Sequence, residues 1–150
     1  MNTVLFLCTG NYYRSRYAEV FFNWQAELRA IPWRADSRGL ALSPSNLGPM
    51  SHFTADRLQQ QGISLDPYMR LPLDAAELDF ERATRIVAVK GSEHRPLMTQ
   101  RYPHWSERVE FWEVHDIDCA HPDQALPHLE RQVMELFTRL EEPLTAKRVG

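Results

Sequence analysis

The chain has 150 residues, 43% of them hydrophobic and 25% charged, and its formal net charge is −3. This length is typical of one compact domain around a single core, so we expect one domain over residues 1–150. The charge balance, without clustered Lys and Arg, argues against nucleic-acid binding, and no apolar run approaches the roughly 20 residues that span a bilayer.

Strands and helices are predicted to alternate along the chain. Continuous apolar runs predict strands buried on both faces, and apolar residues three or four apart predict helices. In the first half of the chain we expect a strand over 2–7, a loop over 8–14, a helix from Ser15 that Pro32 stops, a strand over 34–40, a loop over 42–49 and a helix over 51–61. In the second half we expect a short helix over 74–80, a strand over 84–89, a helix over 92–101, a strand over 109–112, a polar loop over 115–122 and an amphipathic helix marked by Leu126 to Leu140.

This alternation predicts an α/β fold. We expect three layers, α/β/α, around a central four-stranded parallel sheet with right-handed crossovers and flavodoxin-like strand order. In such folds ligands bind beyond the C-terminal ends of the strands. Cys8 follows the first strand and Asp116 follows the last one, so we expect both at the same edge of the sheet.

Residues 8–15 form a Cys-x5-Arg-Ser segment between the first strand and the first helix. A loop at this junction can curl so that successive backbone N–H groups point inward, and the helix N-terminus adds partial positive charge. Gly10 and Asn11 are the residue types that best tolerate the positive φ angles of such a loop. The segment therefore predicts a phosphate-binding loop after the first strand.

The side chains of this loop indicate its chemistry. Arg14 can reach back and hold two phosphate oxygens in a bidentate fork. The same positive field favours the thiolate of Cys8, which is the nucleophilic form, and Ser15 can donate its hydroxyl to that sulfur. The candidate catalytic residues are thus Cys8 and Arg14, and the candidate phosphate-binding residues are Thr9, Gly10, Asn11, Tyr12, Tyr13, Arg14 and Ser15.

Residues 4–19, VLFLCTGNYYRSRYAE, resemble the N-terminal phosphate loop of low-molecular-weight protein tyrosine phosphatases. The resemblance continues at 36–39, 55–63, 85–89 and 111–116, and so extends over nearly the full length. It implies hydrolysis of phosphotyrosine or another aryl phosphate through a phosphocysteine intermediate on Cys8. No metal or organic cofactor is expected, because the loop amides and Arg14 supply the stabilising charge.

Several positions depart from the family pattern. Tyr13 stands where the family commonly has a second cysteine, which makes a disulfide within the loop impossible, and Arg16 replaces the proline that usually follows Arg-Ser. The strand from residue 84 ends in Val89-Lys90-Gly91, where the family usually has Met-Asp. The expected acid loop reads Asp116-Ile117-Asp118 instead of Asp-Pro followed by aromatic residues.

A phosphomonoester leaving group needs a proton on its bridging oxygen, which a carboxylic acid usually supplies. Asp116 aligns best with the acid of the family, because it lies four residues after Trp112. Asp118, two residues further on, is the alternative acid. Asp123 is the better candidate for capping the last helix.

The two tyrosines of the loop have different expected roles. We expect Tyr12 to flank an aryl phosphate, and Tyr13 to pack under the loop in the space that the family gives to cysteine. Asn11 is expected to hold a left-handed conformation and to brace the loop through side-chain hydrogen bonds.

Two other functions stay open at this point. One is thiol-dependent arsenate reduction, which reuses the same loop but needs partner cysteines, of which only Cys119 is available. The other is a non-catalytic phosphate- or phosphoprotein-binding module, which the altered acid loop supports. The leading function predicts a phosphotyrosine protein or a small aryl phosphate as partner, with no nucleic acid, membrane or metal, and a monomer or weak homodimer.

The expected compartment is the cytoplasm. The apolar segment 4–7 is too short for the core of a signal peptide, and no basic segment precedes it. Two distant cysteines, Cys8 and Cys119, then predict reduced thiols rather than a disulfide framework.

Overall fold

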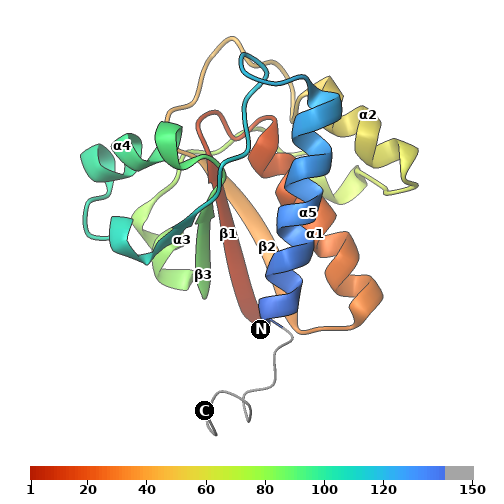
Figure 1. The fold of residues 1–150 in the computed structure, drawn as a ribbon, viewed down its shortest axis with the longest axis horizontal. Coiled ribbons are helices and arrows are strands. Elements are labelled where there is room, and N and C mark those ends of the chain that lie inside the picture. The colour runs from red at the N-terminus through yellow and green to blue at the C-terminus, as the bar shows by residue number, and fades with distance from the viewer. Residues whose placement is uncertain (141–150) are drawn as a thin grey trace, which may run out of the picture.

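The computed structural model describes residues 1–140, which form a sheet covered by helices on both faces (Figure 1). The sheet has four parallel strands in the order β2-β1-β3-β4, namely β1 (Asn2–Cys8), β2 (Trp33–Gly39), β3 (Arg85–Ala88) and β4 (Val109–Phe111). The helices are α1 (Arg14–Arg29), α2 (His52–Gln60), α3 (Glu77–Arg82), α4 (Gly91–Arg101) and α5 (Pro122–Leu140), with short 3-10 turns at Asp66–Tyr68 and Ser106–Arg108. The predicted three-layer α/β fold is confirmed, and the strand order is consistent with a flavodoxin-like arrangement.

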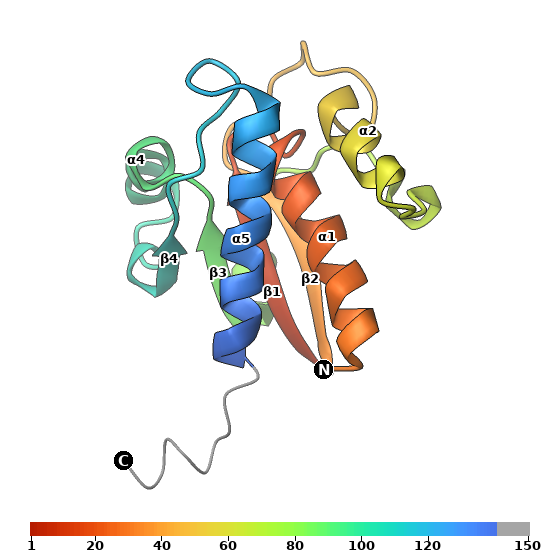
Figure 2. The same cartoon turned by 45° about the vertical axis from the view of Figure 1, so that its right-hand side comes forward.

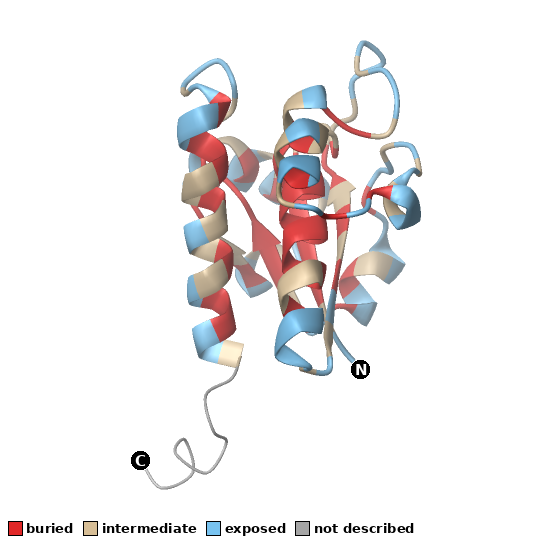
Figure 3. Ribbon diagram, turned by 90° about the vertical axis from the view of Figure 1, so that its right-hand side faces the viewer, coloured by how far each residue is buried: buried red, intermediate tan, exposed pale blue. Residues whose placement is uncertain are grey.

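Helices α1 and α5 lie side by side on one face of the sheet, and α3 and α4 lie on the other face (Figures 1 and 2). In Figure 3 the buried residues of α1 and α5 face the sheet, while the exposed ones face outward. This is the expected pattern for amphipathic helices that cover a sheet. Within the described part of the chain, no helix combines the length and the apolar character needed to cross a membrane.

Strand β1 is buried on both faces, which accounts for its uninterrupted apolar sequence. Val4, Phe6 and Cys8 belong to the core cluster that includes α1 and α5. Leu5 and Leu7 belong to the cluster that includes α3 and α4. Successive side chains of a strand point to opposite faces, so the side chain of Cys8 leaves the sheet on the side of α1 and α5.

The short helix expected over 74–80 forms instead over Glu77–Arg82. Asp74 pairs with Gly39 in an isolated parallel bridge, and Ala76 keeps an extended backbone. The N–H of Ala76 donates to Asp79 Oδ2 at 2.8 Å. The pairing of Asp74 with the edge of the sheet therefore delays the start of the helix.

The prediction that Asp123 caps the last helix is wrong. Helix α5 begins at Pro122, and the N–H of Asp123 donates to His121 Nδ1 at 3.1 Å. Proline suits the first helical position, because it has no N–H to satisfy and its φ is already helical. Asp123 thus lies in the first turn, where its charge complements the helix dipole.

Candidate active site

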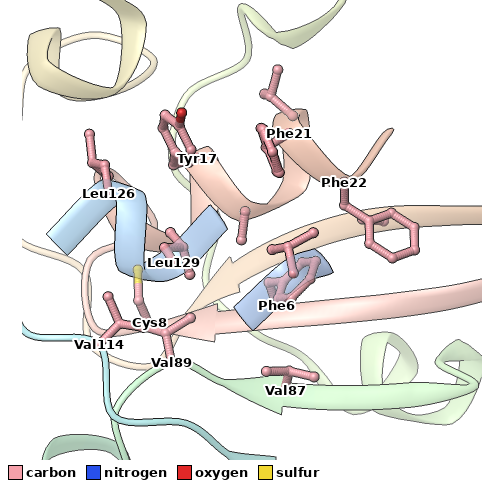
Figure 4. Packing of buried hydrophobic residues seen from close by; sticks show 14 of the residues in the cluster. Phe6, Cys8, Tyr17, Phe21, Phe22, Val87, Val89, Val114, Leu126 and Leu129 are labelled. Atoms are coloured by element: carbon pink, nitrogen blue, oxygen red, sulfur yellow. The ribbon is translucent and has the colours of Figure 1, made fainter. Parts of the chain in front are cut away.

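The segment between β1 and α1 encloses a cavity of about 170 Å³ at the C-terminal edge of the sheet. The residues that line it are Cys8, Thr9, Gly10, Tyr12, Tyr13, Arg14, Asn46, Ser51, Asp116 and Ile117. Figure 4 shows Cys8 at the end of β1, among Val89, Val114 and Leu129. The thiol, the arginine and one of the two candidate acids therefore face the same small space.

The sulfur of Cys8 has a defined hydrogen-bond partner. Its Sγ lies 2.8 Å from Ser15 Oγ, in the first turn of α1. Ser15 Oγ also accepts a hydrogen bond of 3.0 Å from Asn11 Nδ2. Because Asn11 supplies a donor to that oxygen, the hydroxyl hydrogen of Ser15 is free to point at the sulfur, where it stabilises a thiolate.

Asn11 adopts the left-handed conformation expected for it, with φ at 50°. Its amide nitrogen donates to Ser15 and, at 2.8 Å, to Ser37 Oγ. Its amide oxygen accepts from the Leu73 N–H and from an Arg70 guanidinium nitrogen, both at 3.0 Å. These four bonds offset the cost of about 1 kcal/mol for a left-handed non-glycine residue.

A buried ion pair continues this network beneath the loop. Ser37 Oγ donates to Glu19 Oε1 at 2.6 Å, and Arg16 donates to the same oxygen at 2.7 Å. The side chain of Arg16 is fully buried, and its other terminal nitrogen donates to the carbonyl of Tyr68. Burial raises the pKa of Glu19, although Arg16 and Ser37 act against this shift. Arg16, which departs from the family's proline, thus joins the loop to the turn at Tyr68.

Gly39, at the end of β2, allows the neighbouring strand to approach the loop closely. A Cβ atom at this position would lie 2.6 Å from Leu42 Cδ2 and 2.9 Å from the carbonyl oxygen of Thr9. Both distances are too short for non-bonded atoms, so a larger residue would push the loop out of place.

Arg14 is buried, with 2% of its side chain exposed, and three acceptors surround its guanidinium. One terminal nitrogen donates to the Val114 carbonyl at 3.0 Å, and the other donates to Glu93 Oε2 at 2.7 Å. The second nitrogen also lies 3.4 Å from Asp116 Oδ2. Burial alone would lower the pKa of Arg14, but Cys8 and the hydrogen bond to Glu93 raise it, so the guanidinium keeps its charge.

Asp116 and Asp118 differ in their position relative to the cavity. Asp116 lines the cavity, with 42% of its side chain exposed, and its Oδ1 accepts the Ile117 N–H at 2.8 Å. Asp118 is exposed and is not among the lining residues. Of the two candidate acids, Asp116 therefore has the position from which a carboxyl group can reach a bound phosphate ester.

The two tyrosines both line the cavity but are held differently. The hydroxyl of Tyr12 donates to the Leu47 carbonyl at 2.7 Å, which ties the phosphate loop to the loop over 42–49. Tyr13 is 6% exposed and belongs to the core, as expected for a residue that packs under the loop. Its hydroxyl is buried and has no hydrogen-bond partner within residues 1–140. Burial, together with the charge of Asp116, raises the pKa of Tyr13 to about 12.

The two cysteines are free thiols, and they differ in exposure. Cys119 is exposed, lies 3.6 Å from Lys90 Nζ and does not line the cavity around Cys8. Over the described residues 1–140, no group of three or more His, Cys, Asp and Glu side chains has an arrangement that fits a metal ion.

Several residues that contact the loop were not predicted from the sequence as site residues, among them Ser37, Arg70 and Glu93. Ser37 lies in the 36–39 segment on which part of the family resemblance rests, so that segment carried a usable signal. Arg70 and Glu93 come from a loop and from the first turn of α4, and neither lies in a recognisable motif. Only the fold brings them to the loop.

The comparisons with known proteins agree with this geometry. A family model described as low molecular weight phosphotyrosine protein phosphatase matches residues 3–145. Among solved structures, YfkJ from Bacillus subtilis is 22% identical with a TM-score of 0.81, covering 95% of this chain and 96% of that one. A low molecular weight protein tyrosine phosphatase from T. tengcongensis is 22% identical with a TM-score of 0.79, covering 93% and 99%.

A third similar structure is the YwlE arginine phosphatase from Geobacillus stearothermophilus, 19% identical with a TM-score of 0.69, covering 99% of this chain and 96% of that one. A comparison with curated protein sequences gives no significant match. The family match spans nearly the whole chain, and the fold is shared with these structures. The chain therefore belongs to the low molecular weight phosphotyrosine protein phosphatase family and is a cysteine-dependent phosphatase.

Proposed function

We propose that this phosphatase hydrolyses phosphotyrosine, or another aryl phosphate, through a phosphocysteine intermediate on Cys8. One observation carries the proposal: the sulfur of Cys8 contacts Ser15 Oγ at 2.8 Å in a cavity that Arg14 and Asp116 also line. Nucleophile, phosphate-binding cation and proton donor are thereby gathered around one space of suitable size for a phosphate group.

In the first step the Cys8 thiolate attacks phosphorus, and the bond from phosphorus to the bridging oxygen breaks. Arg14 and the N–H groups of the loop stabilise the charge on the non-bridging oxygens. The departing oxygen takes the proton of the Asp116 carboxyl group, so the alcohol or phenol leaves neutral. The products of this step are the free hydroxyl compound and phosphocysteine.

In the second step water attacks the phosphorus of phosphocysteine, and the sulfur–phosphorus bond breaks. The Asp116 carboxylate, ionised after the first step, takes a proton from the water. The sulfur leaves with the electron pair of the broken bond as the thiolate, which a hydrogen bond from the Ser15 hydroxyl stabilises, and inorganic phosphate is released. The same carboxyl group thus serves as acid and then as base.

Tyr12 and Ile117 support an aromatic leaving group. Both line the cavity, and Ile117 remains 47% exposed at its mouth. A flat ring that leaves the cavity would pass between these side chains and bury apolar surface against them. The position of Cys119 disfavours arsenate reduction, because that exposed thiol does not line the cavity and therefore has no direct path to Cys8.

The test is turnover of para-nitrophenyl phosphate, phosphotyrosine peptide and phosphoarginine by the wild type and three variants. We expect the aryl esters to be hydrolysed, Cys8→Ser to be inactive, and Asp116→Asn to lose at least about a hundredfold in kcat. Asp118→Asn serves as the matched carboxylate control and should stay near the wild-type rate.

Three outcomes would contradict the proposal. Loss of activity in Asp118→Asn but not in Asp116→Asn would move the acid to Asp118. A clear preference for phosphoarginine over both aryl esters would replace the substrate class. Phosphate binding without turnover of any ester would make the protein a binding module.

A further inference from the structure

We propose that Glu93 is a positioning residue for the phosphatase reaction. Its carboxylate holds the two ends of the phosphate loop, at Thr9 and Arg14, and is the nearer of the two carboxylate counter-ions of Arg14, which leaves Asp116 available as the proton donor. This inference rests on the proposed function for the role of Asp116, but the contacts of Glu93 can be tested independently of turnover.

The contacts of Glu93 cross the fold from one layer to another. Glu93 lies in the first turn of α4, and its Oε2 accepts a hydrogen bond of 2.7 Å from Arg14, which begins α1. The same oxygen accepts the hydroxyl hydrogen of Thr9, the first loop residue after β1. One carboxylate oxygen therefore bridges both ends of the loop, and it fixes the spacing between the amide-rich turn and the guanidinium.

His94 extends this network, because its Nε2 contacts both Thr9 and the Glu93 carboxylate. His94 is fully buried, and its Nδ1 accepts the Lys90 N–H at 3.0 Å. An Nδ1 that accepts a hydrogen bond carries no proton, so Nε2 carries it; this nitrogen hydrogen-bonds to Thr9 Oγ1 at 3.1 Å and lies 3.1 Å from Glu93 Oε2. Burial lowers the pKa of His94, which keeps the ring neutral. Arg14 is then the full positive charge that Glu93 faces.

The hydrogen bonds to Glu93 keep it ionised. Burial would raise the pKa of Glu93, but the bonds from His94, Arg14 and Thr9 hold it well below its usual range. A carboxylate that never takes up a proton in the working pH range cannot be the general acid. Its function is limited to holding Arg14 and the loop.

Glu93 and Asp116 compete for the same nitrogen of Arg14. The nitrogen lies 2.7 Å from Glu93 Oε2 and 3.4 Å from Asp116 Oδ2. The shorter contact belongs to the more buried carboxylate, with 27% of the Glu93 side chain exposed against 42% for Asp116. Glu93 thus satisfies the charge of Arg14 that would otherwise draw Asp116 into a tight ion pair and favour its ionised form.

The other groups around Asp116 do not replace this charge. Arg14 and Tyr13 face it from the phosphate loop and α1, and Glu93 and His94 approach from α4. Tyr13 and His94 are neutral at working pH, because burial raises the pKa of the phenol and lowers that of the imidazole. Removal of the Glu93 charge therefore leaves Asp116 as the carboxylate counter-ion of Arg14, beside the Cys8 thiolate.

The experiment compares Glu93→Gln with the matched control Glu113→Gln. Both changes remove one carboxylate near the start of α4 while keeping side-chain shape. Glu113 accepts the Ser92 N–H at 3.0 Å and has no contact with the phosphate loop in the described residues. A Thr9→Val variant removes the donor at the other end of the loop and provides a second, independent probe.

We expect Glu93→Gln to lower kcat for para-nitrophenyl phosphate about tenfold or more. The alkaline limb of the kcat/KM profile, which the general acid sets, should move to lower pH by roughly half a unit or more. Glu113→Gln should leave both unchanged. A Glu93→Gln enzyme with kcat within twofold of the wild type and an unmoved alkaline limb would overturn the proposal.

The contacts are tested without turnover by NMR of the Cys8→Ser protein with and without Glu93→Gln. We expect the amide signals of residues 9–14 and the Arg14 side-chain signal to shift and their hydrogen exchange to accelerate, and we expect no such change for Glu113→Gln. Thr9→Val should perturb the same signals. Unchanged loop signals would overturn the role of Glu93, whereas an inactive wild type with the expected NMR changes would refute only the proposed function.

Discussion

Ser15 Oγ lies 2.8 Å from the sulfur of Cys8, and the serine is itself fixed by a 3.0 Å hydrogen bond from Asn11. Because the Asn11 amide occupies an acceptor position of Ser15, the serine hydrogen is directed to the sulfur. The end of β1 and the start of α1 are thereby connected through side chains as well as through the loop backbone. In the proposed mechanism this contact assigns the serine a role that can be measured separately from substrate binding.

Ser15→Ala should slow the breakdown of phosphocysteine more than its formation. A hydrogen bond to a charged group contributes about 1.5–3 kcal/mol, so we expect kcat to fall roughly tenfold to a hundredfold. Stopped-flow measurement of para-nitrophenol release should show a burst followed by a slow steady state. A proportional loss in both phases, without accumulation of phosphoenzyme, would contradict this role for Ser15.

The backbone conformation and the side chain of Asn11 should each contribute separately to the free energy of unfolding. Asn11→Ala and Asn11→Gly both lose the four hydrogen bonds, but only alanine also bears the cost of φ at 50°. We therefore expect the alanine variant to be less stable than the glycine variant by about 1 kcal/mol in urea unfolding. Equal stabilities would show that the loop relaxes out of the left-handed conformation.

Tyr13→Phe should stabilise the protein. The Tyr13 hydroxyl is buried without a partner in the described residues, and removing an unsatisfied polar group should raise the free energy of unfolding by about 1 kcal/mol. Tyr102→Phe is the matched control with the opposite sign, because the Tyr102 hydroxyl donates to the Ala75 carbonyl at 2.6 Å. Thermal unfolding of both variants tests the pair. A destabilised Tyr13→Phe protein would indicate that this hydroxyl has a partner after all.

The stability of the protein in acid should depend on Glu93. The pKa of Glu93 is lower in the folded state than its ordinary value of 4.5, so the folded state binds fewer protons than the unfolded chain. Its contribution to stability is therefore present above about pH 4.5 and is lost as the pH falls below that value. Glu19, whose pKa burial raises, acts in the opposite direction, since its contribution declines as the pH rises.

Urea unfolding between pH 2.5 and pH 7 measures this dependence. We expect the stability of the wild type to fall more steeply below about pH 4.5 than that of Glu93→Gln. Glu113→Gln, which removes a carboxylate without this hydrogen-bond cluster, should keep the wild-type slope. Parallel slopes for the wild type and Glu93→Gln would show that Glu93 is not selectively ionised in the folded state.

The sequence was sufficient for the fold, the family and the position of the phosphate loop. Apolar runs around Val4–Leu7 and Ile86–Val89 reveal strands because burial on both faces requires continuous apolar sequence. The Cys-x5-Arg-Ser spacing reveals the loop because its chemistry is local, within residues 8–15. Boundaries that depend on tertiary contacts were less accurate, as the late start of α3 after the Asp74 bridge shows.

The residues that support the loop from other elements could not be predicted either, because their positions also depend on tertiary contacts. Arg70 and Glu93 meet the loop only after a chain separation of 59 residues from Asn11 and 79 from Arg14, respectively. No periodicity or short motif encodes such a contact. Arg16 departs from the family's proline, and its ion pair with Glu19 is a local contact three residues apart in α1; only the burial of that pair depends on the packing of α1 against β2.

The alternation of side chains along β1 sets the direction of the Cys8 sulfur. Val4, Phe6 and Cys8 share one face of the strand, so the side chain of Cys8, the proposed nucleophile, points to the same side of the sheet as two core residues. Deletion of a single residue between Val4 and Leu7 would reverse the parity of the strand and turn the thiol towards α3 and α4, away from Ser15. The register of β1, set several residues before the loop begins, therefore determines where the Cys8 sulfur lies.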